Sequence, residues 1–339
     1  MSDLSLLATL IAQTDEATAA GLGTVAKFVT ALGRGLALGS IYALLALSFV
    51  LVFKATQAVN FAQGAIALVG TWFLSMLLVN WRIPARWLGD DLARNRYLVW
   101  ILAGVVALVM SIALGLIIER LMIRPMIGKP LFAIAVLTLG LEAVLRTVGN
   151  DALIGQQRGL QIPWGRTGFE LQGAFIYWTY VGAIVTAAAA FVATFLFFRT
   201  RTGIAMRAVA FDQEASMAQG IRVGRVFAIA WGSGAALAVL GAIFFSMSPF
   251  GNGIAETGLT SLAFRALPAV ILGGLDSVPG ALIGGLAIGL AEVFAGVYLA
   301  ESTATLGVGY QLVVPYLVML LVLFVRPYGL FGTEEIRRV

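Results

Sequence analysis

The chain has 339 residues, of which 60% are hydrophobic and 12% charged, with a mean hydropathy of +0.96 and a net charge of +5. A soluble domain is about half apolar and about a quarter charged, so the composition predicts an all-α, polytopic membrane helix bundle. Cysteine and histidine are both absent from the sequence. This excludes disulfides, His- or Cys-based metal and haem sites and a Ser-His-Asp triad, and we expect no cofactor, no metal and no catalytic site. The basic residues sit beside apolar runs, which is typical of membrane loops and not of nucleic-acid binding.

Residues 1–32 begin with acidic rather than basic side chains and have only one short apolar stretch, so they predict an extramembrane segment and not a cleaved signal. Residues 33–326 are expected to form the transmembrane domain. Its clear apolar runs predict spans at 33–53, 60–79, 97–118, 131–148, 175–198, 226–247, 279–299 and 311–325. A glycine-rich ninth run at 258–275 is expected to be a short or broken span. The sequence thus predicts eight to ten transmembrane helices, with nine favoured.

Loop charges give the orientation of these spans. If the basic loop 199–225 is cytoplasmic, the basic loop 119–129 falls on the same side. The tail, 327–339, is cytoplasmic only if 258–275 crosses the membrane. Residues 81–96, which hold four arginines and two aspartates, are then outside, against the charge rule. We therefore expect nine crossings with the amino end outside and the carboxyl end in the cytoplasm.

The one long polar interruption, residues 199–225, holds five arginines and two carboxylates. Its middle, 204–219, is rich in helix formers, and Gly220 is suited to end a helix. A short amphipathic helix on the cytoplasmic face suits docking to a soluble partner. An ordinary positively charged loop explains the same composition equally well.

The predicted spans contain few charges. Glu142 and Arg146 are four residues apart and share one helix face, whereas Glu292 and Arg265 each stand alone in their spans. A proton- or sodium-coupled carrier usually needs an ionisable relay inside the membrane, and these four residues make a poor one. No phosphate-binding G-x-x-x-x-G-K-[ST] motif occurs, so the chain is not expected to hydrolyse ATP itself.

Small residues recur at helical spacing in the predicted spans. Gly-x-x-x-Gly occurs at Gly35–Gly39, Gly280–Gly284 and Gly285–Gly289. Such pairs let helix backbones approach closely in lipid. Any glycine-rich membrane protein contains several such matches, so a single motif is weak evidence, and together they predict tight packing between helices or with a partner subunit.

Six motifs, in the same order along the chain, resemble the permease subunits of branched-chain amino acid ABC importers. They are G-S-I-Y-A-L-L-A-L at 39–47, V-N-F-A-Q-G at 59–64, I-E-R-L-M-I-R-P at 118–125, the loop segment 203–220, A-V-I-L-G-G-L-D-S-V-P-G-A-L-I-G-G-L at 269–286, and R-P-Y-G-L-F-G at 326–332. The sequence departs from the family pattern at two positions. Gln63 replaces a histidine, which leaves amide hydrogen bonding but no titratable imidazole. Asp276 replaces a glycine, so the local turn is expected to differ.

The resemblance implies a subunit without enzymatic activity in a multi-pass assembly of the prokaryotic plasma (inner) membrane. A solute-binding protein would deliver the substrate, a second permease subunit would complete the pathway, and two cytoplasmic ATPase subunits would supply energy. The segment 203–220 would dock the ATPase. The residues expected to couple transport to ATP hydrolysis are Arg207, Ala208, Asp212, Glu214, Ala215 and Gly220.

Polar and small residues near the starts of the first two spans are candidates for the substrate pathway. They are Ser40, Tyr42, Asn60, Gln63 and Gly64. A helix start whose amides are satisfied internally explains them equally well. The substrate remains open between branched-chain amino acids and urea or short-chain amides, because the motifs are shared. An autonomous secondary carrier or channel is disfavoured by the missing relay, and a membrane enzyme by the missing catalytic groups.

Overall fold

A computed structural model describes residues 23–83, 86, 94–153, 159–254, 256–299, 307 and 309–332. The first 22 residues of the expected extramembrane segment and the tail from residue 333 lie outside this part. The described helices are α2 (Thr24–Thr56), α3 (Gln63–Ser75) with η1 (Met76–Asn80), α5 (Arg96–Ile118) with η2 (Glu119–Ile123) and η3 (Arg124–Met126), α6 (Leu131–Leu153), α7 (Trp178–Phe198), α8 (Arg201–Phe211), α9 (Gln213–Ala218), α10 (Val223–Phe245), α11 (Glu256–Gly273), α12 (Val278–Tyr298), η5 (Tyr310–Leu312) and α14 (Val314–Val325).

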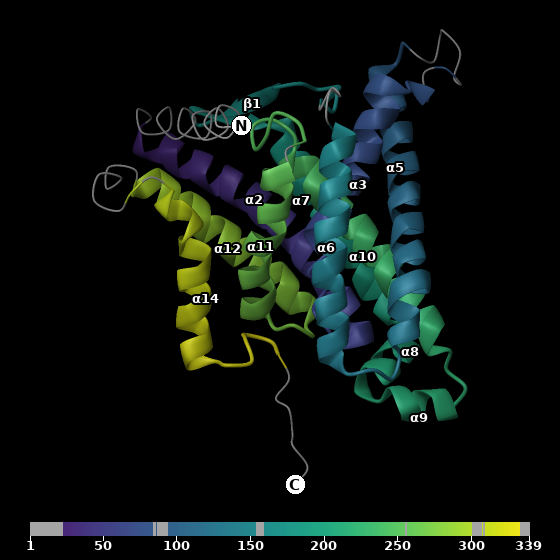
Figure 1. The fold of residues 1–339 in the computed structure, drawn as a ribbon. Coiled ribbons are helices and arrows are strands. Elements are labelled where there is room, and N and C mark those ends of the chain that lie inside the picture. The colour runs from purple at the N-terminus through teal and green to yellow at the C-terminus, as the bar shows by residue number, and fades with distance from the viewer. Residues whose placement is uncertain are drawn as a thin grey trace.

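The predicted polytopic helical bundle is confirmed (Figure 1). Among the described residues, seven helices are long and apolar enough to cross a membrane. The apolar helices at Gly258–Gly273 and Tyr310–Val325 are shorter. These two segments are the expected short or broken span and the last expected span, so the count of nine crossings stays a prediction.

A β-hairpin corrects the predicted start of one span. Strands β1 (Gly168–Leu171) and β2 (Ala174–Tyr177) pair antiparallel, and α7 begins only at Trp178, not at residue 175. The two residues between the strands, Gln172 and Gly173, both have positive φ, as a tight two-residue hairpin loop requires. Hydropathy could not separate strand from helix here, because β2 and α7 form one continuous apolar run.

Helix α2 is the central element of the bundle (Figure 1). It is 33 residues long, begins nine residues before the predicted span, and is buried on every side between residues 37 and 52. Its most extensive neighbours are α12 and α10. Helices α5, α6 and α7 instead expose most of their apolar side chains. The exposed apolar surfaces of these helices are suited to lipid or to another membrane subunit.

Backbone contact between α2 and α12 depends on glycine. A Cβ added to Gly39 would lie 2.8 Å from the Cα of Leu286, and one added to Gly285 would lie 2.5 Å from the Cα of Ala43. A Cβ on Gly289 would fall on the backbone of Gly39. The motifs that contain Gly39 and Gly289 therefore face each other, which allows an approach closer than any larger residue permits.

The remaining Gly-x-x-x-Gly motif, Gly280–Gly284, packs α12 against α11. A Cβ on Gly280 would fall on the carbonyl oxygen of Gly273, and one on Gly284 on that of Ala269. Helix α12 thus has two glycine faces, one for α2 and one for α11. The tight packing predicted from the three motifs is present within this one chain.

The bundle has two distinguishable ends, which we name the hairpin end and the α8 end. At the hairpin end, Arg166 Nε donates a hydrogen bond to Ser248 Oγ, just after α10, at 2.8 Å. At the α8 end, Leu330 N donates to the carbonyl oxygen of Leu272, near the end of α11, at 2.8 Å. The end of α11 lies at the α8 end, because Phe331, next to Leu330, lines the same cavity as Arg199 and Arg207. Residues 326–332 lie at the α8 end.

We predict that Gly289→Ala destabilises the protein although alanine is the better helix former. The new methyl group has no room against Gly39, and overpacking costs about 1–3 kcal/mol. Gly140→Ala is the matched control, because a Cβ there meets nothing within 4 Å. Thermal unfolding in detergent should show a lower midpoint for Gly289→Ala and an equal or higher one for Gly140→Ala. Equal midpoints in both variants would contradict the close packing.

Candidate functional site: a two-helix projection and the polar groups behind it

The polar segment folds as two short helices, not as the single helix predicted over 204–219. Asp212 interrupts it in an extended conformation, with φ −156° and ψ 111°. The Asp212 carboxylate accepts a hydrogen bond from Ala215 N at 2.9 Å and so caps α9. Aspartate favours this cap over a helix interior, because its side chain competes for backbone N–H groups. Gly220, with φ +79°, ends α9 as predicted.

Buried side chains anchor this projection to the bundle. Met206 and Val209 of α8 belong to the main hydrophobic core, and Ser216 of α9 is buried. Thr200 Oγ1 accepts a hydrogen bond from Gly203 N at 3.2 Å and caps the start of α8. The outward surface of α8 and α9 is thereby held in a fixed position.

An open groove of about 390 Å³ lies on α8 and α9. It is lined by Ala208, Phe211, Asp212, Ala215, Ser216, Gln219 and Ile221. Three of the six predicted coupling residues, Ala208, Asp212 and Ala215, are among them. The other three lie elsewhere: Arg207 and Glu214 are exposed outside the lining, and Gly220 ends α9.

Phe211 also lines this groove, although it is not among the coupling residues predicted from the sequence. Its side chain is 93% exposed. An exposed aromatic side chain beside a groove is typical of a protein contact surface. In the sequence Phe211 lies in a stretch of helix formers, and nothing there marks it as exposed. Only the break at Asp212 shows that it ends α8 in the open.

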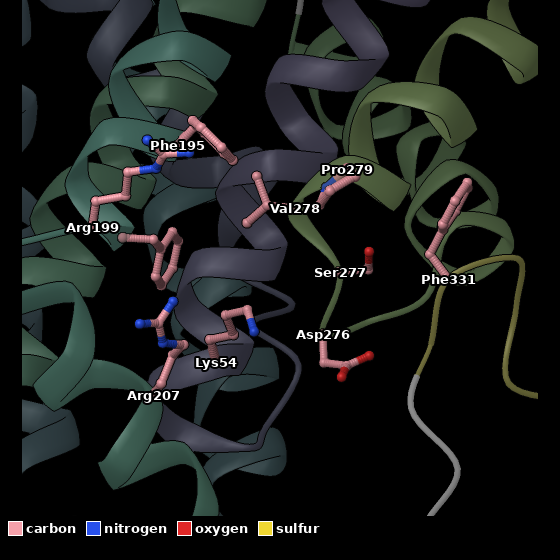
Figure 2. Close-up of a pocket in the computed structure, with 10 residues that line it drawn as sticks. Lys54, Phe195, Arg199, Arg207, Asp276, Ser277, Val278, Pro279 and Phe331 are labelled. Atoms are coloured by element: carbon pink, nitrogen blue, oxygen red, sulfur yellow. The ribbon is translucent and has the colours of Figure 1, made fainter.

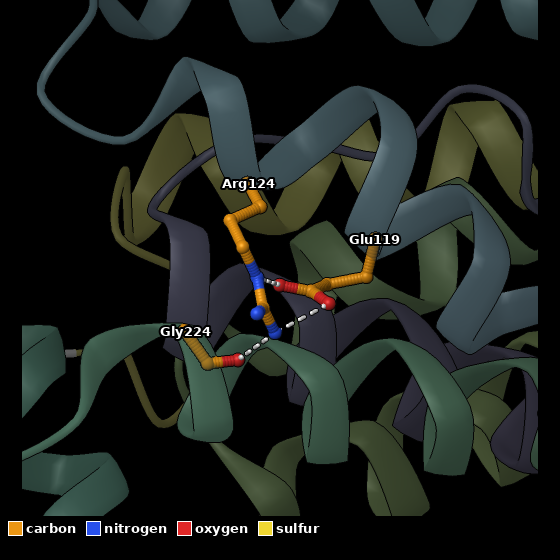
Figure 3. A network of polar contacts seen from close by, with 3 residues as sticks. All are labelled: Glu119, Arg124 and Gly224. Carbon is orange, nitrogen blue, oxygen red and sulfur yellow. Dashed lines mark hydrogen bonds and ion pairs between the residues drawn. The ribbon is translucent and has the colours of Figure 1, made fainter.

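A salt-bridged clamp of Glu119 and Arg124 lies at the start of α10, the helix that follows the projection (Figure 3). Arg124 donates from Nε and Nη2 to the two carboxylate oxygens of Glu119, each at 3.0 Å, and from Nη2 to the carbonyl oxygen of Gly224 at 3.2 Å. Glu119 is 1% exposed. The clamp joins the end of α5 to the start of α10, the helix that follows α9. The I-E-R-L-M-I-R-P motif thus has a structural role that the sequence left unassigned.

A second polar cluster lies between three helices, with Tyr42 and Glu292 buried and Arg265 partly exposed. Tyr42 Oη of α2 donates a hydrogen bond to Glu292 Oε2 of α12 at 2.6 Å. Arg265 Nη1 of α11 lies 3.6 Å from Glu292 Oε1. The prediction that Glu292 and Arg265 are isolated charges is therefore wrong. They are far apart in sequence, and only the packing of α11 on α12 brings them together.

The other pathway candidates have internal partners. Asn60 Nδ2 donates to Gln63 Oε1 at 2.6 Å, and Gln63 Nε2 donates to the carbonyl oxygen of Gly234 at 3.0 Å. Ser40 Oγ donates to the carbonyl oxygen of Leu36 at 2.8 Å. Gly64 packs against Ala263 of α11. This arrangement fits the alternative of a helix start with satisfied amides, and the role of these residues in a pathway stays a prediction.

A charge-poor bundle of apolar helices with a polar two-helix projection at one end defines a multi-pass membrane protein. The chain belongs to the family described as "branched-chain amino acid transport system / permease component", whose sequence model matches residues 31–323. This family membership confirms the resemblance seen in the motifs.

Several known proteins are similar to the chain over most of its length. The high-affinity branched-chain amino acid transport system permease proteins BraD of Pseudomonas aeruginosa and LivH of Escherichia coli are each 29% identical over 323 residues, which is 92% of this chain and 98% of theirs. A probable branched-chain amino acid transport permease protein of Methanocaldococcus jannaschii is 27% identical over 292 residues, 86% of this chain and 88% of its own. No solved structure matches the chain.

We predict that Arg124→Ala lowers thermal stability, because it leaves the buried Glu119 carboxylate without this ion-pair partner. Since Arg124 is 36% exposed and water screens part of the interaction, we expect a cost of about 1–3 kcal/mol. Arg120→Ala, which removes an exposed arginine of the same segment, is the control and should have little effect. If the two variants lowered the midpoint of thermal unfolding equally, the clamp would contribute nothing to stability.

Proposed function

We propose that this chain is the membrane-spanning permease subunit of an ATP-binding cassette importer for branched-chain amino acids. A solute-binding protein delivers the substrate, a second permease subunit completes the pathway, and two ATPase subunits hydrolyse ATP. The family and the printed functions of its relatives support the substrate class. The groove on α8 and α9, with the exposed Phe211 beside it, is the observation that supports ATPase docking.

The orientation follows from the charge at the α8 end. The polar segment 199–225 carries five arginines, and loops rich in arginine remain in the cytoplasm. The segment 326–332, which starts with Arg326, lies at the same end. We therefore place the α8 end in the cytoplasm, where ATPase subunits can reach the groove, and the hairpin end on the outer face of the inner membrane, where a binding protein docks.

The charged residues within the apolar helices form ion pairs, and this argues against an autonomous ion-coupled carrier. Glu292 is bound to Tyr42 and lies beside Arg265. Arg146 Nε lies 3.0 Å from Glu142 Oε1 within one helix. A proton relay needs groups that can exchange protons along a path, and these carboxylates are neutralised by fixed cations. Energy supplied by a partner subunit fits this interior better.

Reconstitution of the complete complex tests the proposal. In vesicles that contain this chain, its partner permease and the ATPases, uptake of labelled leucine should require both ATP and the binding protein. Isoleucine and valine should compete for uptake, and urea and short-chain amides should not. Uptake that proceeds without ATP would overturn the proposal. Competition by urea alone would instead indicate a urea or short-chain amide permease.

The groove itself is tested in the same vesicles by Ala215→Trp. The indole would fill the groove and hold the ATPase away, so substrate-stimulated ATP hydrolysis should fall at least about tenfold, the effect of losing an interface hot spot. Glu214→Ala, on the same helix but outside the groove lining, should have a small effect, because an exposed ion pair contributes only ~0.2–1 kcal/mol. Near-normal hydrolysis in Ala215→Trp would mean that the segment is an ordinary charged loop.

A further inference from the structure

A second cavity, of about 480 Å³, opens at the α8 end between the end of α7 and the start of α12 (Figure 2). Three cations line it, namely Lys54 from α2, Arg199 from the end of α7 and Arg207 from α8. Asp276, from the turn before α12, is the one carboxylate among its lining residues. The cavity therefore carries a net charge of +2 from its side chains, and a cavity of this size accommodates a small charged group.

Aromatic rings hold two of the cations in place. The Arg199 guanidinium lies 4.6 Å from the centre of the Phe195 ring, and Lys54 Nζ lies 5.7 Å from that of Phe198. A ring face attracts a cation without offering an oxygen acceptor. Asp276 in the same lining attracts Lys54, and the N–H donors of the three cations together can also bind an anion with several oxygens, such as a phosphate.

The position of the cavity indicates where that phosphate comes from. Phe195 and Phe198 belong to the last turn of α7, one of the membrane-spanning candidates. Apolar side chains along α7, including Val185, Val192 and Leu196, are more than half exposed. A ligand with a phosphate in the cavity can therefore extend apolar chains along the face of α7. This combination of a cationic pocket at a helix end and an apolar helix face suits an anionic phospholipid.

We propose that Lys54, Arg199 and Arg207 form a binding site for the phosphate of an anionic phospholipid, whose acyl chains lie along α7. This site is separate from the groove on α8 and α9, and the two share no lining residue. Asp276 opposes the anion and sets an upper limit on its affinity. Bound lipid would join α2, α7 and α8 at the membrane surface, so the site ties the projection to the surrounding bilayer.

The test uses the complete transporter complex in phosphatidylcholine nanodiscs that contain a small fraction of phosphatidylglycerol. After detergent extraction, native mass spectrometry counts the lipids that remain bound. We expect phosphatidylglycerol to be retained in preference to phosphatidylcholine. Lys54→Gln combined with Arg199→Gln should lower that retention at least about tenfold, since each cation near an anionic headgroup contributes to binding. Arg120→Gln, which removes an exposed charge outside the cavity, should leave it unchanged.

Two further variants separate charge from packing. Lys54→Arg combined with Arg199→Lys keeps both charges and should retain the lipid, whereas a loss equal to that of the glutamine pair would show that packing alone matters and overturn the proposal. Asp276→Asn removes the opposing carboxylate and should raise retention. Unchanged or lower retention in Asp276→Asn would contradict an electrostatic site.

Other outcomes identify other occupants. Equal retention of the two lipids in the natural protein would overturn the proposal. Displacement of phosphatidylglycerol by inorganic phosphate would assign the cavity to a soluble anion. Retention by the permease pair alone that disappears when the ATPases bind would assign it to a protein interface. Either of the last two results would overturn a lipid site.

Discussion

The close contact between α2 and α12 determines how the other helices of the bundle are arranged. Gly39, Gly285 and Gly289 have no side chain that could hold the two backbones apart. At that separation Tyr42 reaches Glu292, and α12 still has a second glycine face for α11. In a membrane the hydrophobic effect does not hold helices together, so close packing and a buried hydrogen bond replace it. The central position of α2 follows from this contact.

The same framework positions the projection. Helix α10 packs along α2, and its start follows α9 and is clamped to α5 by Arg124 and Glu119. A partner bound in the groove therefore contacts a segment that continues directly into a helix of the central layer. Contiguous, rigid elements of this kind can carry a displacement from a docking surface to the interior of the bundle. The polar cluster of Tyr42, Glu292 and Arg265 lies in that interior, where α2 meets α11 and α12.

Much of this structure could be predicted from the sequence, because long apolar runs and glycine spacing depend on local pattern. The rest depends on contacts that the pattern does not contain. The strand at Ala174–Tyr177 is as apolar as the helix after it. The helix breaks at Asp212 because this side chain caps α9, although good helix formers lie on both sides. The pairing of Arg265 with Glu292 and the exposure of Phe211 arise only when helices pack. The pathway residues stay predictions because their polar groups are engaged inside the bundle.

Docking of an ATPase subunit in the groove on α8 and α9 can be observed by crosslinking. The most direct measurement places a photo-crosslinking amino acid at Phe211 in the assembled complex and, for comparison, at Glu170 in the hairpin. We expect a crosslink from position 211 to the ATPase, and from position 170 either none or one to the binding protein. No ATPase crosslink from position 211, or one from position 170, would contradict this docking.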